Sequence, residues 1–339
     1  MKQRKIYFDT GAQGLLLLLL FSQLFFNNAL YLTIGALVFG FMVSRLQIPY
    51  KPSIFTIVFI YHFIQISAWV WMVNYMDVDI DFKSPHSGLA VLLAYLGLMV
   101  LLGPVIYFND KLPNVSFSTL KKHADKLSIQ KTFIAYVVAF FSMNTLGAAA
   151  FAFSGLTQII FSLVNIKWFF FLLFGYQVIT KRQMIREFSI FVVIEFAMGF
   201  FSYFSDFKTV FFFLSCLFLT FLVRVSLKQL SFAIISLIFM TFIGITWTSI
   251  KGEYRSFLNQ GSKTQTVQVS QEAAIDKLIE LTEQEKDTSA TISFFERIQY
   301  TWHLAKSMDH VPSVLSYQNG NNWLESISFA LTPRYFNPD

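Results

Sequence analysis

TQIIFSLVNIKWFFFLLFGYQVIT, residues 157–180, is almost wholly apolar and long enough to cross a lipid bilayer, which needs about 20 such residues. Lys167 lies close to the middle of this stretch, and a lysine at the bilayer centre is costly to insert. We therefore expect residues 157–166 to lie along the membrane interface and a membrane span to begin near Lys167. The stretch indicates membrane-spanning helices rather than the core of a soluble domain.

The composition of the whole chain leads to the same class of protein. Of its 339 residues, 55% are apolar and 14% are charged, and 42 are phenylalanine, which is more apolar surface than one soluble core can bury. The net charge of +6 is expected from cytoplasmic loops of a membrane protein, so we expect no nucleic-acid partner. The single cysteine, Cys216, lies within an apolar stretch and gives neither a disulfide nor a thiolate metal site. We predict an all-α, polytopic integral membrane protein.

Hydropathy predicts about nine transmembrane helices. The basic start and short apolar run at the N-terminus resemble a signal peptide, but no small-x-small cleavage site follows, so we expect a retained first span. The predicted spans lie at about 13–27, 29–44, 53–73, 87–108, 131–153, from 167 onward, 188–204, 208–223 and 230–249.

The distribution of basic residues predicts the orientation. With nine spans, nearly all lysines and arginines of the short connections fall on one side, and only Lys83 and Lys208 fall on the other. By the positive-inside rule the N-terminus is cytoplasmic and the residues after Lys251 are extracytoplasmic. The chain thus divides into a transmembrane helical domain, 1–250, and an extracytoplasmic, mostly helical region, 251–339.

The extracytoplasmic region begins with a polar linker, 262–270. Residues 271–286 predict a helix with Ile275, Leu278 and Ile279 on one face. Residues 292–308 predict another helix, on which Glu296, Tyr300 and His303 share a face. The remaining residues predict a loop and a short helix that ends before Pro333.

Candidate functional residues gather in this polar region. Arginine binds phosphate oxygens in pairs and keeps its charge, so Arg255, Arg297 and Arg334, with Lys251, suit a phosphate or pyrophosphate ligand. Solvation at the surface or contact with lipid head groups is the alternative for each of them.

A general base is also available in this region. Glu296 and His303 are the candidates, since a carboxylate or a neutral imidazole takes up a proton near neutral pH. Asp309 and His310 are further alternatives, and simple solvation of these side chains is another. No metal-ligand spacing or phosphate-binding glycine motif occurs, so we expect no metal and no cofactor.

Three ionisable residues fall inside predicted spans: His62, Lys167 and Glu195. Such residues are usually functional or paired with each other. We expect a hydrogen bond between helices to explain Lys167 and Glu195, and a path for protons or substrate is the alternative.

Three short motifs follow the apolar part of the chain: W-x-x-I-K-x-x-Y-R at Trp247 to Arg255, E-R at Glu296 and Arg297, and P-R-x-x-x-P-D at Pro333 to Asp339. With the many spans before them, they resemble bacterial O-antigen or exopolysaccharide repeat-unit polymerases of the Wzy type, in the O-antigen polymerase and ligase superfamily. Such enzymes are multi-pass proteins of the bacterial cytoplasmic (inner) membrane. They join oligosaccharide units carried on undecaprenyl pyrophosphate at the periplasmic face.

The resemblance implies roles for particular residues. Arg255, Arg297 and Arg334 would hold the pyrophosphates, and a carboxylate or histidine would deprotonate the acceptor hydroxyl. The resemblance also implies three partners: the polyprenyl-pyrophosphate oligosaccharide lipid, a chain-length regulator and a flippase. Family members usually continue into further spans, so a chain that stops at Asp339 is expected to be a truncated or degenerate copy.

Two other functions compete with a polymerase. An O-antigen ligase has a similar architecture but uses a lipid A core as acceptor. A non-catalytic transporter or envelope scaffold is the alternative from another class. A transporter should show inverted repeats and paired broken spans, which the sequence does not clearly contain.

Overall fold

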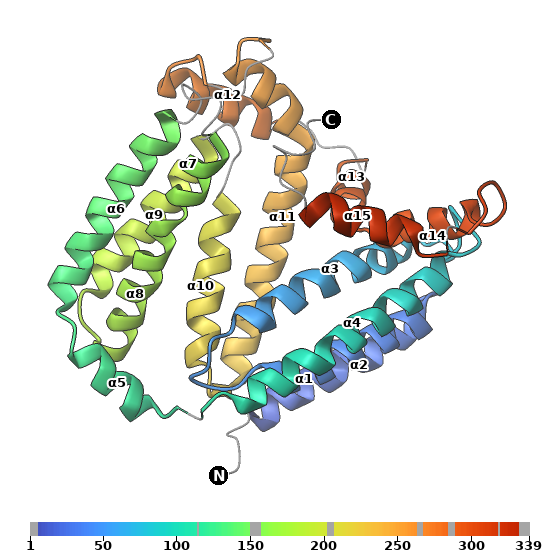
Figure 1. Ribbon diagram of the computed structural model, residues 1–339, viewed down its shortest axis with the longest axis horizontal. Coiled ribbons are helices and arrows are strands. Elements are labelled where there is room, and N and C mark those ends of the chain that lie inside the picture. Colours follow the sequence, from blue (N-terminus) through green and yellow to red (C-terminus); the bar gives the residue numbers. More distant parts are fainter. Residues whose placement is uncertain are drawn as a thin grey trace.

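The computed structural model describes residues 6–113, 115–149, 157–201, 207–262, 267–283, 289–317 and 319–331. Helices dominate this part of the chain (Figure 1). Its strands are two-residue elements, β1 (Tyr7–Phe8) and β2 (Arg224–Val225), which pair in parallel. The predicted all-α class is confirmed.

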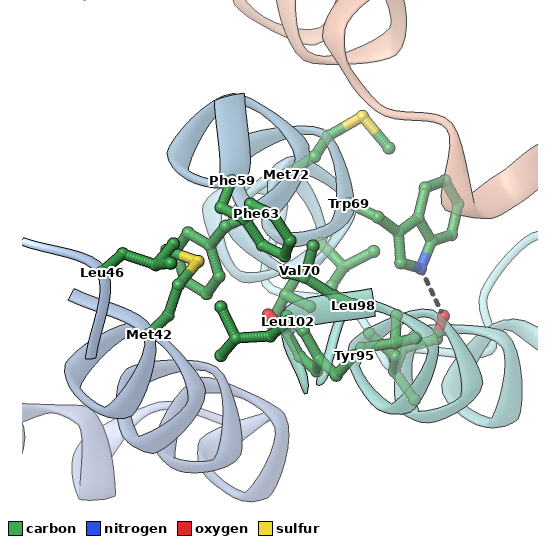
Figure 2. Packing of buried hydrophobic residues seen from close by; sticks show 13 residues of the cluster. Met42, Leu46, Phe59, Phe63, Trp69, Val70, Met72, Tyr95, Leu98 and Leu102 are labelled. Carbon is green, nitrogen blue, oxygen red and sulfur yellow. Dashed lines mark hydrogen bonds between the residues drawn. The ribbon is translucent and has the colours of Figure 1, made fainter. Parts of the chain in front are cut away.

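The first group of helices packs around one apolar core. Figure 2 shows this core, to which α2, α3 and α4 contribute Met42, Phe63, Trp69 and Leu102. The Trp69 indole N–H donates to the carbonyl of Ile80, 3.1 Å away, so the buried ring keeps a hydrogen bond. The helices of this group are α2 (Ala29–Leu46), α3 (Ile54–Tyr75) and α4 (Ser87–Lys111). Helix α1 (Thr10–Ser22) and a short 3₁₀ turn, η1 (Gln23–Phe25), precede them and contribute no residue to this core.

A second group of helices has an aromatic core of its own. Tyr136, Trp168, Phe171 and Phe174 lie at its centre and are buried. Stacked and edge-to-face ring pairs fill the space between the helices, for example Trp168 on Phe213 with ring centroids 4.8 Å apart. The helices of this group are α5 (Phe117–Asp125), α6 (Ile129–Ala149), α7 (Thr157–Val164), α8 (Ile166–Lys181), α9 (Ile185–Phe201) and α10 (Phe207–Phe221).

A helix occupies part of each of the nine predicted spans, but the helices differ in length. Within the described residues, five are long and apolar enough to cross a membrane. The apolar helices at Thr10–Phe25 and Lys208–Phe221 are shorter. The count of nine spans therefore stays a prediction. The five longer helices are Ala29–Leu46, Ile54–Tyr75, Ser87–Lys111, Ile159–Lys181 and Leu227–Leu258.

The stretch 157–180 forms two helices that meet next to Lys167. The first ends at Val164 and the second begins at Ile166. Asn165 between them keeps helical backbone angles, φ −67° and ψ −12°, so Ile159–Lys181 also suffices as one span. The predicted interfacial placement of residues 157–166 remains a prediction.

Many of the connections predicted to be cytoplasmic meet at one end of the molecule, the lower end in Figure 1. The Tyr50 backbone N–H donates to the Thr220 carbonyl (2.8 Å), and Lys51 Nζ donates to the Asn109 carbonyl (2.7 Å). Lys181 Nζ donates to the carbonyl of Leu127 (2.6 Å). Basic residues of these described connections thus lie at one end of the bundle. The alternation of nine spans and the side of the membrane that this end faces remain predictions.

The longest helix, α11 (Leu227–Leu258), connects the apolar part of the chain to the polar part. It has 32 residues, which is about 48 Å at 1.5 Å per residue. Ser226 and Gln229 form a capping box at its start. The helix continues across the expected boundary at 250/251, so the division into domains at that point also remains a prediction. Among the described residues after α11, the helices are α12 (Gln271–Glu283), α13 (Ser289–Ile298), α14 (Thr301–His310) and α15 (Asn321–Leu331).

Two details of the polar region correct the sequence prediction. Residues 292–308 are not one helix, because the Tyr300 N–H donates to the Gln65 carbonyl and the Thr301 hydroxyl donates to the Ile66 carbonyl, each at 3.2 Å. These hydrogen bonds to α3 separate α13 from α14. On α12, the residues packed against α11 are Ala274, Leu278 and Leu281, whereas Ile275 and Ile279 of the predicted face are exposed.

Candidate functional site

Cationic side chains from three helices lie within electrostatic range of Lys251, beyond the apolar part of α11. Lys251 and Arg255 are four residues apart and therefore share one face of α11. The positive charges of Arg255, Arg297 and Lys208 all act on the ammonium group of Lys251. We call these four residues, Lys208, Lys251, Arg255 and Arg297, the cation cluster.

A glycine allows α13 to bring Arg297 to this position. Phe294 of α13 packs on α11 at Gly244, where an added Cβ would lie 2.4 Å from the ring. Cβ atoms are not found at that separation, so a larger residue would displace the Phe294 ring from α11. The close contact between α11 and α13 therefore helps to assemble the cluster.

The cation cluster has one sign of charge and is open to solvent. Lys208 and Arg297 are exposed, and Lys251 and Arg255 are partly exposed. No carboxylate of the described residues forms an ion pair with Lys208, Lys251 or Arg297. Like charges held together repel one another, and an anion bound between them would remove that repulsion.

The predicted phosphate-binding residues are thus brought together in part. Arg255, Arg297 and Lys251 gather as expected, while Arg334 lies outside the described residues. Sequence reasoning missed Lys208, which joins them from the start of α10. The signal was present, because Lys208 and Lys83 are the basic residues assigned to the less basic side of the predicted bundle.

The predicted base, Glu296, forms an ion pair with Lys83. Glu296 Oε1 lies 2.5 Å from Lys83 Nζ, and the Glu296 side chain is 42% exposed. His303 is exposed on α14 and packs its ring beside Tyr300 and Trp302. Neither a hydrogen bond nor an ion pair joins Glu296 to His303 within the described residues. The prediction that these two residues share one helical face is wrong, because they lie on different helices.

The loop before α4 holds α13 and α14 in place. Besides the Lys83–Glu296 pair, the Ser84 hydroxyl donates to Asp309 Oδ2 at 2.5 Å. His86 Nε2 lies 3.7 Å from Asp309 Oδ1. Asp309, an alternative base from the sequence, is thus occupied by contacts that fix α14 to this loop.

A second set of charges lies buried among α6, α8 and α9. Lys167 Nζ donates to Glu195 Oε2 (2.8 Å) and to Asn144 Oδ1 (3.2 Å). The Tyr136 hydroxyl donates to the other carboxylate oxygen of Glu195 (3.1 Å). The side chains of Lys167 and Glu195 are 10% and 3% exposed. The predicted hydrogen bond between helices is confirmed, and we call these four residues the buried pair site.

The third ionisable residue of the predicted spans is at the surface. His62 lies exposed on α3 and its Nδ1 is 3.1 Å from Gln65 Oε1. It therefore belongs to neither of the two charged sites.

Comparison of the chain with protein-family models, with curated proteins and with solved structures finds no match. The resemblance to repeat-unit polymerases therefore depends on the short sequence motifs alone.

Proposed function

We propose that the protein is a membrane glycosyltransferase that polymerises undecaprenyl-pyrophosphate-linked oligosaccharide repeat units into O-antigen, capsule or exopolysaccharide. The observation that supports this most strongly is the convergence of Lys208, Lys251, Arg255 and Arg297. A pyrophosphate carries several negative charges, and guanidinium groups bind its oxygens in pairs. A lipid-linked pyrophosphate also suits a site at the end of a long apolar helix.

The reaction in this proposal is a substitution at a sugar carbon. A hydroxyl of the acceptor unit attacks the anomeric carbon of the growing chain, a new C–O bond forms, and the bond from that carbon to the pyrophosphate oxygen breaks. The hydroxyl proton passes to a base, and undecaprenyl pyrophosphate leaves with the bonding electron pair. The cation cluster stabilises the charge on the leaving group, which is the kind of electrostatic contribution that is usually largest in catalysis.

Glu296 is the base in this proposal. It lies next to Arg297 on α13, and within the described residues only its Oε1 has a hydrogen-bond partner. Its second oxygen is therefore available to accept a proton. Lys83 pairs with the other oxygen of the carboxylate, Oε1.

The proposal also includes a cellular setting. The protein would reside in the bacterial cytoplasmic (inner) membrane with a cytoplasmic N-terminus and a periplasmic C-terminal region. A flippase would supply its lipid-linked substrate, and a chain-length regulator would be a further partner. The positive-inside pattern and the gathering of basic connections at one end of the bundle support this orientation.

Deletion of the gene, followed by electrophoresis of the surface polysaccharide, tests this function. We expect the ladder of chain lengths to collapse to a single repeat unit and to return with the wild-type gene. Arg255→Lys or Arg297→Lys should restore it poorly, because lysine keeps the charge but loses the paired guanidinium geometry. The control is Arg186→Lys, since Arg186 is an exposed arginine at the basic end.

Three results would contradict the proposal in whole or in part. An unchanged ladder after deletion would favour a transporter or scaffold. Polymer of normal length that is no longer attached to the lipid A core would identify a ligase instead. A normal ladder from an Arg255→Lys, Arg297→Lys double variant would remove the pyrophosphate role of the cluster.

A further inference from the structure

A hollow lies between the last turns of α11 and the segment that includes the first half of α12. Its volume is about 430 Å³, within the range of about 300–1,000 Å³ that is common for small-molecule sites. Three of its lining residues lie on one face of α11, one follows the end of that helix, and two come from the segment that returns to it. The lining residues are Glu253, Ser256, Phe257, Gln260, Val269 and Lys277.

The charges of this hollow are balanced, in contrast to the cation cluster. Lys277 Nζ lies 3.1 Å from Glu253 Oε1 and 2.7 Å from Oε1 of Glu280, which does not line the hollow. Hydrogen bonds to Glu280 and Glu253 raise the pKa of Lys277, so its ammonium group is charged at neutral pH. Within the lining, one positive charge faces one negative charge, which favours a neutral ligand over an anion.

The polar groups of the hollow suit a ligand rich in hydroxyl groups. The Glu253 carboxylate accepts hydrogen bonds and the Lys277 ammonium donates them, whereas the Ser256 hydroxyl and the Gln260 amide do both. A sugar hydroxyl also donates and accepts hydrogen bonds, so it can donate to the carboxylate and accept from the ammonium group. Phe257 and Val269 add an apolar surface for the C–H groups of a sugar ring.

The hollow and the cation cluster lie on opposite faces of the same helix. Glu253 falls between Lys251 and Arg255 in the sequence, and successive residues of a helix are about 100° apart. A helix with its side chains is about 10–12 Å across, a distance that a few linked sugars can cover. We infer that the hollow binds a sugar of the oligosaccharide whose pyrophosphate lies in the cation cluster. This inference rests on the function proposed above.

The test uses the purified full chain in nanodiscs and an oligosaccharide without phosphate. The probe is the free repeat-unit oligosaccharide released by mild acid from the lipid-linked units of the host, with binding followed by saturation-transfer NMR. Glu253→Gln should weaken binding roughly 10-fold to 100-fold because a charged hydrogen-bond acceptor is lost. Ser256→Trp should abolish it by filling the hollow.

The matched control is Glu280→Gln. Glu280 contacts the same lysine from outside the lining, so its loss removes a similar ion pair without changing the hollow, and binding should stay at the wild-type level. Thermal unfolding of each variant verifies that it is folded. Absence of saturable binding to the wild type, or equal binding by Ser256→Trp, would overturn the inference.

The two proposals can fail separately. If the polysaccharide ladder depends on Arg297 but oligosaccharide binding does not depend on Glu253 or Ser256, only the sugar site is wrong. If the ladder is unchanged after deletion of the gene, the proposed function is wrong, whatever the hollow binds.

Discussion

The buried pair site and the cation cluster show two ways in which a predominantly apolar protein holds charge. At the buried pair site, Lys167 and Glu195 neutralise each other, and Asn144 and Tyr136 complete their hydrogen bonds. At the cation cluster, charges of the same sign are held together in contact with solvent. The first arrangement is neutral, whereas the second concentrates positive charge.

The difference separates a role in the fold from a role in binding. Three helices meet at Lys167 and Glu195, so the pair fixes how α6, α8 and α9 pack. On α11, Lys251 and Arg255 share one face, and Arg297 of α13 acts on Lys251 as well. Repulsion between these like charges does not stabilise the fold. Substitutions at the two sites should therefore change different properties, and the following predictions test that separation.

The largest effect on stability is expected at the buried pair site. Lys167→Met should lower the free energy of unfolding by about 3–5 kcal/mol, because Glu195 is left as an uncompensated buried charge. The double variant Lys167→Met, Glu195→Leu should regain most of that loss, since an apolar pair of similar volume is often as stable as a buried ion pair. Unfolding in detergent with a fluorescence readout measures both variants. A double variant as unstable as the single one would indicate that the charges do more than pack the helices.

The next largest effect is expected at Glu296, where substitution should lower the rate of polymer synthesis rather than the stability of the protein. As the base, Glu296→Gln should lower polymer synthesis about 100-fold. The unfolding free energy should change by less than about 1 kcal/mol, because the pair with Lys83 is partly exposed. Lys83→Met is the matched control, since it breaks the same ion pair and keeps the carboxylate. Synthesis of repeat-unit polymer in membranes is the readout, and equal losses in the two variants would mean that only the ion pair matters.

The smallest effect is expected at the cation cluster in the absence of ligand. Lys251→Met should leave the free energy of unfolding unchanged or raise it by about 0.5–1 kcal/mol, because repulsion from Arg255, Arg297 and Lys208 is relieved. The sign is opposite to that for Lys167→Met, although both variants replace a lysine by methionine. Parallel unfolding curves of the two variants make the comparison. A clear loss of stability in Lys251→Met would show that the lysine is paired within the protein.

The sequence predicted the class of fold and one of the two charged sites because both follow from local patterns. Apolar stretches of span length indicate helices, and two opposite charges in neighbouring spans have few alternatives to pairing. The break between α13 and α14 was not predictable, because the hydrogen bonds of Tyr300 and Thr301 go to α3, far away in the sequence. Lys208 and Lys83 were visible as unusual basic residues, but only the tertiary structure shows that Lys83 pairs with Glu296 and that Lys208 is within electrostatic range of Lys251.

Binding of undecaprenyl pyrophosphate to the purified protein tests the role of the cation cluster most directly. The ligand is compared with undecaprenol, which has the same lipid chain without the pyrophosphate, and the variant is Arg255→Gln, Arg297→Gln with Arg186→Gln as its control. We expect the wild type and the control to prefer the pyrophosphate roughly 100-fold, because charged hydrogen bonds contribute strongly, and the double variant to lose that preference. Equal affinity of the wild type for both lipids would contradict the proposal that these cations bind a pyrophosphate.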